Sequence, residues 1–137
     1  MSLIDVSRSY PHLLTVTDGL SKEELSRLDS VCGTVTLEPQ SYLFHQHSAA
    51  QSCYIVNEGE LMIERSSSAG RRQILAFICP GNFIGFTHGD YFEFSVKALS
   101  NAVLTKIPMN KFLDLADEIP QLKRNTERIS GNVLAHT

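Results

Sequence analysis

Tryptophan is absent from this sequence, and cysteine occurs at only three positions. Cys32, Cys53 and Cys79 are far apart and form no CxxC pair, which argues against a disulfide framework and a zinc knuckle. No apolar run reaches the roughly 18 residues of a membrane helix, and the first residues lack the apolar core of a secretory signal. We therefore expect reduced thiols, a cytoplasmic location and no membrane partner.

Positive charge is also scarce. The chain has 12 Lys and Arg against 15 Asp and Glu, a formal net charge of −3. A nucleic-acid-binding domain usually carries a basic patch, so we expect that these residues do not bind DNA by themselves. No P-loop, GxSxG, Ser-His-Asp order or paired-carboxylate pattern occurs, and we predict that the chain is not an enzyme.

The 137 residues, of which 42% are hydrophobic, suit one compact domain. Ser21 and Glu24 form a capping-box pattern that predicts a helix over 21–32, with Gly33 as its stop. Eight short runs with β-type alternation follow, separated by turn residues. They span 34–37, 42–44, 53–56, 60–64, 72–78, 82–84, 94–98 and 102–107. This pattern predicts a mainly β fold with flanking helices, an antiparallel sandwich or barrel of the jelly-roll (double-stranded β-helix) type.

Helical periodicity returns after Pro108, and Pro120 suits the first position of a second helix. In that helix, residues at intervals of four and three form a heptad-like seam: Leu122, Thr126, Ile129 and Val133. We expect a β-roll with flanking short helices at residues 1–119 and the start of a dimerisation helix, cut short, at 120–137. In the alternative, this helix packs back on the roll of its own chain.

Four motifs carry a family resemblance, in addition to the order helix, eight-stranded roll, short helix and long helix. They are Phe44 with Ile55, Val56, Gly59 and Glu60; the segment 70–75; the two-glycine turn 80–86; and the segment 95–98 followed by 107–108 and Phe112. Together they resemble the N-terminal sensor domain of the CRP/FNR family of bacterial transcription regulators. The pattern from Gly70 to Gly85 resembles the FixK-like branch, and the similarity covers roughly residues 13–134.

The resemblance implies an effector-sensing and dimerisation domain. The roll would control the angle or register of a long helix in a homodimer, and that helix would position C-terminal helix-turn-helix domains on DNA. No helix-turn-helix domain is present in this sequence, so DNA would be bound only through a part of the protein missing from this chain.

The turn that resembles the family's effector pocket contains Gly81 and Gly85, but it departs from the cyclic-nucleotide-binding pattern. Phe86 stands where the resemblance places a ribose-binding Glu, and Phe92 and Glu93 stand where it places the phosphate-binding Arg and Ser or Thr. We therefore expect no cyclic nucleotide binding and leave the small effector unidentified. We expect the aromatic residues here to form roll core and to leave a closed or apolar-lined pocket: Phe77, Phe83, Phe86, Tyr91, Phe92 and Phe94.

His45 and His47 form an HxH pair that would share one face of a strand, and His88 is a candidate third ligand. The alternative to a regulator is therefore a stand-alone, cupin-like metal-binding enzyme. Ser52 stands where a cupin would have its Glu, so we favour surface or packing histidines. A third option is an interaction module without an effector.

We favour no cofactor in this chain. Cys79-Pro80 resembles the dipeptide of thiolate haem sites, but a buried cysteine at a strand end is the commoner reading. Cys32 and Cys53 are predicted to be core residues. The absence of a cysteine before Cys32 argues against the four-thiolate iron–sulfur cluster of FNR itself.

Overall fold

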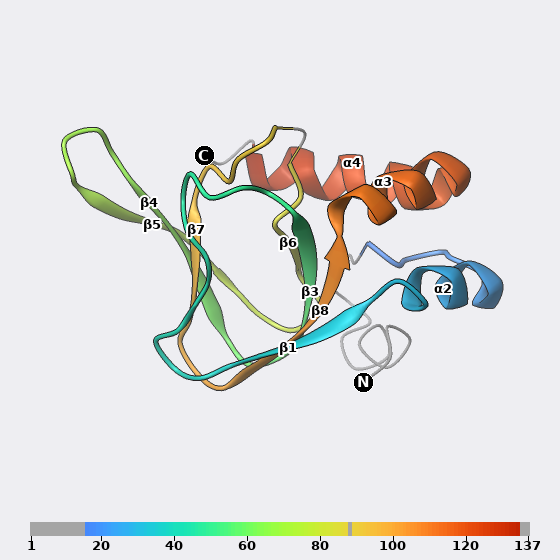
Figure 1. Cartoon of the computed structure of the whole chain (residues 1–137), viewed down its shortest axis with the longest axis horizontal. Coiled ribbons are helices and arrows are strands. Elements are labelled where there is room, and N and C mark those ends of the chain that lie inside the picture. Colours follow the sequence, from blue (N-terminus) through green and yellow to red (C-terminus); the bar gives the residue numbers. More distant parts are fainter. Residues whose placement is uncertain (1–15, 88, 135–137) are drawn as a thin grey trace.

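The computed structural model describes residues 16–87 and 89–134 (Figure 1). Helix α2 (Lys22–Asp29) precedes the strands, and helices α3 (Met109–Glu118) and α4 (Pro120–Leu134) follow them. The strands are β1 (Gly33–Leu37), β2 (Tyr42–Phe44), β3 (Ser52–Glu58), β4 (Leu61–Ser66), β5 (Arg72–Ile78), β6 (Phe83–Ile84), β7 (Ser95–Ala98) and β8 (Ala102–Pro108). The strand order, and the mainly β class with flanking helices, are confirmed.

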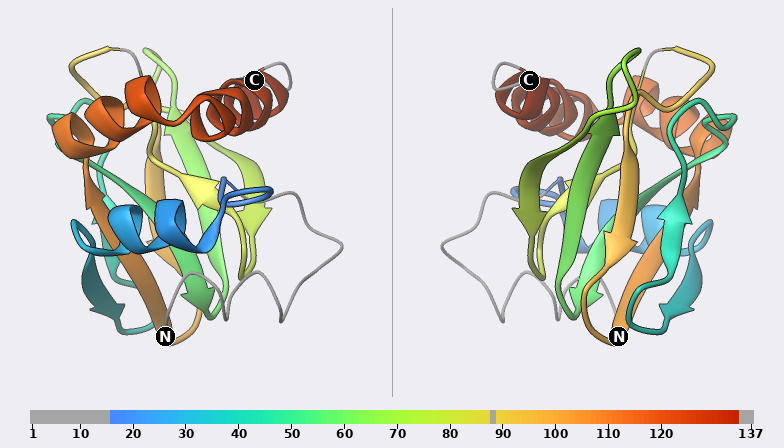
Figure 2. Two further views of the ribbon diagram at one scale, coloured as in Figure 1. Left: turned by 90° about the vertical axis from the view of Figure 1, so that its right-hand side faces the viewer. Right: turned by 90° about the vertical axis from the view of Figure 1, so that its left-hand side faces the viewer.

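The strands form two antiparallel four-stranded sheets with the orders β1-β8-β3-β6 and β2-β7-β4-β5. Strands that follow one another in the chain mostly lie in different sheets, as in a jelly roll. The described helices lie on the side of the first sheet, and the four strands of the second sheet face outward on the other side (Figure 2). Helices, first sheet and second sheet therefore make three layers.

Strand β3 is buried on both faces because it separates two hydrophobic cores. Cys53 and Ile55 belong to the helix-side core, which lies between the helices and the first sheet. Tyr54 and Val56 belong to the inter-sheet core, which lies between the two sheets. Alternate residues of a strand point to opposite faces, so this apolar run supplies both cores at once.

Helix α2 begins with the capping box that the sequence predicts. The Glu24 amide donates to Ser21 Oγ at 3.1 Å, and the Ser21 amide donates to Glu24 Oε1 at 2.9 Å. The helix ends at Asp29 with Ser30 as its C-cap, so the predicted stop at Gly33 is wrong. Gly33 is instead the first residue of β1, where it pairs with Lys106 of β8.

Helix α4 begins at Pro120 as predicted, but its seam faces this chain's own core. Leu122 and Thr126 are 0% and 3% exposed, and Ile129 packs against the helix-side core. For these three positions the structure favours the alternative, a helix packed back on the roll. Val133 lies beyond the last described side chain, and homodimerisation through this helix stays a prediction.

Two of the aromatic residues expected in the core lie on the surface. Phe77 is 71% exposed because it lies on the edge strand β5, opposite Met62 on the outer face of the second sheet. Tyr91 is 62% exposed and lies in the loop before β7. The other four are in or against the two cores, as predicted: Phe83, Phe86, Phe92 and Phe94.

Candidate functional site

The turn that resembles an effector site keeps its two glycines for physical reasons. Gly81 and Gly85 have φ angles of 98° and 86°, a conformation that favours a residue without Cβ. A Cβ on Gly85 would lie 3.2 Å from the Tyr54 ring and 3.3 Å from the Phe44 ring. The turn therefore packs directly against the aromatic part of the inter-sheet core.

That part of the core is a stack of rings. The centroids of the Phe92 and Phe44 rings are 3.7 Å apart, with 14° between the ring planes. The Tyr54 ring also stacks on Phe44, at a centroid distance of 6.0 Å. The Phe92 amide donates to the Ser48 carbonyl at 2.9 Å, and the His47 amide donates to the Phe92 carbonyl at 2.8 Å. The backbone on both sides thus holds Phe92 in the stack.

Charge is arranged unfavourably for a phosphate at this place. Among the residues that the structure describes, no lysine or arginine is buried. Glu93 is exposed, and Phe86 lies on the helix-side core, 5.7 Å from the Phe112 ring. The three positions that hold a cyclic nucleotide in the resemblance therefore lie in different environments. Phe86 lies against the helix-side core, Phe92 lies in the inter-sheet core and Glu93 lies on the surface.

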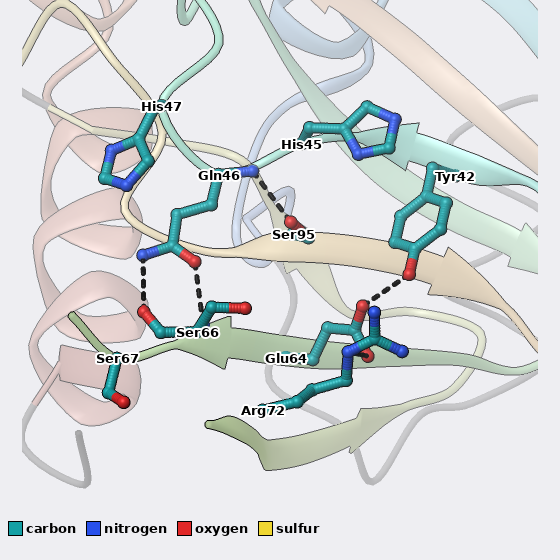
Figure 3. A pocket seen from close by; sticks show the side chains of 9 residues that line it. All are labelled: Tyr42, His45, Gln46, His47, Glu64, Ser66, Ser67, Arg72 and Ser95. Atoms are coloured by element: carbon teal, nitrogen blue, oxygen red, sulfur yellow. Dashed lines mark hydrogen bonds and ion pairs between the residues drawn. The ribbon is translucent and has the colours of Figure 1, made fainter. Parts of the chain in front are cut away.

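The two histidines of the HxH pair do not share a strand face, so this prediction is wrong. Strand β2 ends at Phe44, and the chain turns at His47, which has a positive φ of 74°. His45 stacks on Tyr42 at 4.5 Å, and His47 points away from it (Figure 3). Within the described residues, no group of three His, Cys, Asp or Glu side chains could hold a metal ion. His88 lies outside those residues.

The same turn borders an open pocket of about 500 Å³ on the outer face of the second sheet (Figure 3). Its lining residues come from β2, the turn after it, β4, the hairpin, β5 and β7: Tyr42, His45, Gln46, His47, Glu64, Ser66, Ser67, Arg72 and Ser95. A β-bulge between Ile63 and Glu64 and a register shift along β2 occur beside this pocket.

A buried carboxylate forms part of this pocket wall. Glu64 is 4% exposed, and the Tyr42 hydroxyl donates to Glu64 Oε1 at 2.5 Å. This hydrogen bond, with burial as a smaller cause, raises the pKa of Tyr42. Arg72 Nε lies 3.7 Å from Glu64 Oε2, which accepts no hydrogen bond from any described residue. The sequence did not point to Glu64, because its partners come from two other strands.

Gln46 fixes the turn above this pocket. Its side-chain Nε2 donates to the Ser66 carbonyl at 3.2 Å, and its Oε1 accepts from the Ser66 amide at 2.8 Å. Its backbone amide donates to Ser95 Oγ at 2.7 Å. The turn after β2 is thereby attached to both β4 and β7.

The three cysteines have different environments. Cys53 is buried, and this burial raises the pKa of its thiol; burial also raises the pKa of Cys32 to about 12. Cys79 is exposed, with its Sγ 3.5 Å from Asn82 Oδ1, so the expected burial at this strand end is wrong. An exposed thiol at this turn adds no support to the haem alternative, which stays untested.

No helix among the described residues combines the length and the apolar content needed to cross a membrane.

Comparison with known proteins places these features in a family. Residues 34–118, more than half of the chain, match the family described as cyclic nucleotide-binding domain. The transcriptional activatory protein AadR of Rhodopseudomonas palustris is 27% identical over 109 residues, which are 80% of this chain and 46% of that protein. The nitrogen fixation regulation protein FixK of Azorhizobium caulinodans is 32% identical over 82 residues, 60% of this chain and 33% of that protein. The chain thus spans less than half of either relative.

The catabolite activator protein of Thermus thermophilus has a solved structure with the same fold, at a TM-score of 0.78 and 20% identity. The match covers 88% of this chain and 58% of that chain. The chain therefore belongs to the cyclic nucleotide-binding domain family, and its relatives confirm the resemblance to the CRP/FNR regulators, FixK among them.

Proposed function

We propose that this chain is the effector-sensing and dimerisation part of a bacterial CRP/FNR-type transcription regulator, acting in the cytoplasm and not as an enzyme. One observation carries the proposal: the glycine turn 81–85 packs on a jelly roll that continues through α3 into the long helix α4. The relatives AadR and FixK, named as activating and regulatory proteins, support it. DNA would be bound by a further domain.

The complete gene product tests this proposal. We expect the reading frame to continue past Thr137 into a basic helix-turn-helix domain, and the full-length protein to shift a DNA fragment from its own promoter region in a gel. Sedimentation at micromolar concentration should give a dimer. A frame without a DNA-binding domain, or a full-length protein that stays monomeric, would contradict the proposal.

We further propose that the domain works without a cyclic nucleotide. The ring stack of Phe44 and Phe92, 3.7 Å apart, fills the inter-sheet core beside the glycine turn. No described lysine or arginine is buried there to bind a cyclic phosphate, whose charge would need such a partner. Calorimetric titration with cAMP and with cGMP should give no binding heat, and binding of either at micromolar concentration would refute this part.

A further inference from the structure

The proposed function leaves the outer-face pocket around Glu64 unused. Glu64 is buried, yet its Oε2 accepts no hydrogen bond among the described residues. A buried acceptor without a donor is unfavourable, and buried polar groups in folded proteins nearly always have a partner. The carboxylate lines the pocket, but Oε2 itself has almost no exposed surface and Arg72 lies against it. A molecule bound there can therefore supply the missing donor only when the exposed Arg72 side chain turns away from Oε2.

The neighbours of this oxygen restrict the charge of such a molecule. Arg72 Nε lies 3.7 Å from Oε2, too far for a hydrogen bond, and the Arg72 side chain is 62% exposed. Its guanidinium can therefore turn toward a bound acceptor. A simple anion would be repelled by the buried carboxylate of Glu64, and a simple amine would be repelled by the guanidinium of Arg72. A ligand that carries both charges satisfies both groups.

We infer that this pocket binds a small zwitterion of the α-amino acid class, whose ammonium donates to Glu64 Oε2 and whose carboxylate accepts from Arg72. The two charges of an α-amino acid are carried on adjacent carbon atoms, which suits two protein groups lying side by side. The volume of about 500 Å³ is within the range of small-molecule pockets. A metal ion suits the pocket less, since the described His, Cys, Asp and Glu residues form no group of three.

The Tyr42 hydroxyl and Gln46 prepare the site. The hydroxyl donates a hydrogen bond to Glu64 Oε1, which holds the carboxylate in place and leaves Oε2 without a hydrogen-bond donor. Gln46 holds the rim through the Ser66 backbone and Ser95. The site does not depend on the proposed regulatory function, because all of its groups lie in this chain.

Calorimetry and thermal unfolding of the chain, with each common L-amino acid added separately, test the inference. At least one amino acid should bind and raise the unfolding midpoint. The amine formed by removing its carboxylate and the acid formed by removing its amino group should each bind at least about 10-fold more weakly, since each lacks one charge-assisted contact. The inference is overturned if no amino acid binds, or if either analogue binds as well as its parent.

Two variants and two matched controls locate the binding. Glu64→Gln and Arg72→Gln should each lower the affinity about 10-fold or more. Glu60→Gln and Arg71→Gln, at exposed positions outside the pocket, should leave it unchanged. If Glu64→Gln fails to fold, Arg72→Gln still tests the site, because the Arg72 side chain is exposed. An affinity of Arg72→Gln equal to that of the parent chain refutes the site. These measurements need no DNA, so their failure would leave the regulatory proposal standing.

Discussion

The two hydrophobic cores of this chain share a wall and differ in what they connect. The inter-sheet core closes the roll, mainly with residues of the strands and the stacked pair Phe44 and Phe92. The helix-side core joins distant segments, from Val16 through Leu28 of α2 to Phe112 of α3 and Leu122 of α4. Because β3 alternates between them, neighbouring residues of one strand contact both cores.

The largest effect is expected from removing an aromatic ring of the helix-side core. Phe112 is 0% exposed and lies 5.2 Å from the Phe83 ring. Phe112→Ala should lower the free energy of unfolding by about 3–5 kcal/mol, as in other core truncations. Urea unfolding measures this loss. The adjacent Leu113 is 40% exposed, so Leu113→Ala should cost less than about 1 kcal/mol; equal losses would mean that α3 is not anchored by this core.

The inter-sheet core is tested next, at a turn that has no space for a side chain. Gly59 has a φ of 93°, and a Cβ there would lie 2.4 Å from the Asn101 carbonyl oxygen and 2.9 Å from Ala102 Cβ. Gly59→Ala should therefore lower the free energy of unfolding by about 2–4 kcal/mol, the sum of backbone strain and overpacking.

Gly70 is the matched control for this variant. Its φ is also positive, at 80°, but nothing lies within 4 Å of an added Cβ. Gly70→Ala should cost about 1 kcal/mol from backbone strain alone. If the two variants lose the same stability in urea, steric contact with Ala102 is not what makes Gly59 necessary.

A smaller effect is expected from the polar contact that ties the N-terminal segment to α4. Asn125 is 1% exposed, and its Nδ2 donates to the Val16 carbonyl at 2.9 Å and to the Asp18 carbonyl at 2.6 Å. Asn125→Ala leaves two carbonyls without this donor and should cost about 1–3 kcal/mol in urea unfolding. The exposed Glu127 on the same helix is the control, and Glu127→Ala should stay within about 0.5 kcal/mol of the parent.

The smallest effect is expected from chemical modification of the thiols. Their reaction rates compare Cys32 and Cys53, at the helix-side core, with the exposed Cys79. The thiolate is the reactive form, and the raised pKa of Cys32, about 12, keeps its thiol protonated at neutral pH. Burial raises the pKa of Cys53 as well, whereas Cys79 is exposed. A disulfide reagent should therefore modify one thiol rapidly in the folded chain and three in denaturant.

Two controls identify the reactive thiol. Cys79→Ser should remove the rapid phase, and raising the pH toward 12 should speed the reaction of Cys32 as its thiolate forms. A second rapid thiol at neutral pH in the folded chain would contradict the burial of this part of the core.

The sequence predicted the elements whose signals are local. The capping box at Ser21 and Glu24, Pro120 as a helix start and the eight β runs all depend on neighbours within a few residues. The predicted helix stop at Gly33 is wrong because the role of this glycine depends on pairing with Lys106, a distant residue. The predicted burial of Phe77 is wrong because alternation alone does not say which face of β5 is covered.

The candidate sites show the same division. Heptad spacing identified an apolar face of α4, but spacing cannot say whether a partner or the chain's own core covers Leu122. The HxH pattern places both histidines on one face only if they lie in a strand. Strand β2 ends at Phe44, and the chain turns at His47, which has a positive φ. The contact of Tyr42 with Glu64 joins residues 22 positions apart, and it arises from the register of two sheet strands that both pair with β7. No local pattern carries that information.

The contact between Gln46 and Ser66 also takes the place of a strand pairing at the end of β4. Where the pairing of β4 with β7 ends, at Glu64 and Ser95, the backbone of Ser66 would be open to another strand. The Gln46 side chain takes both its amide and its carbonyl, as a neighbouring strand would. One glutamine thus occupies the strand-pairing groups of Ser66, and the hairpin of β4 and β5 extends beyond this point (Figure 1).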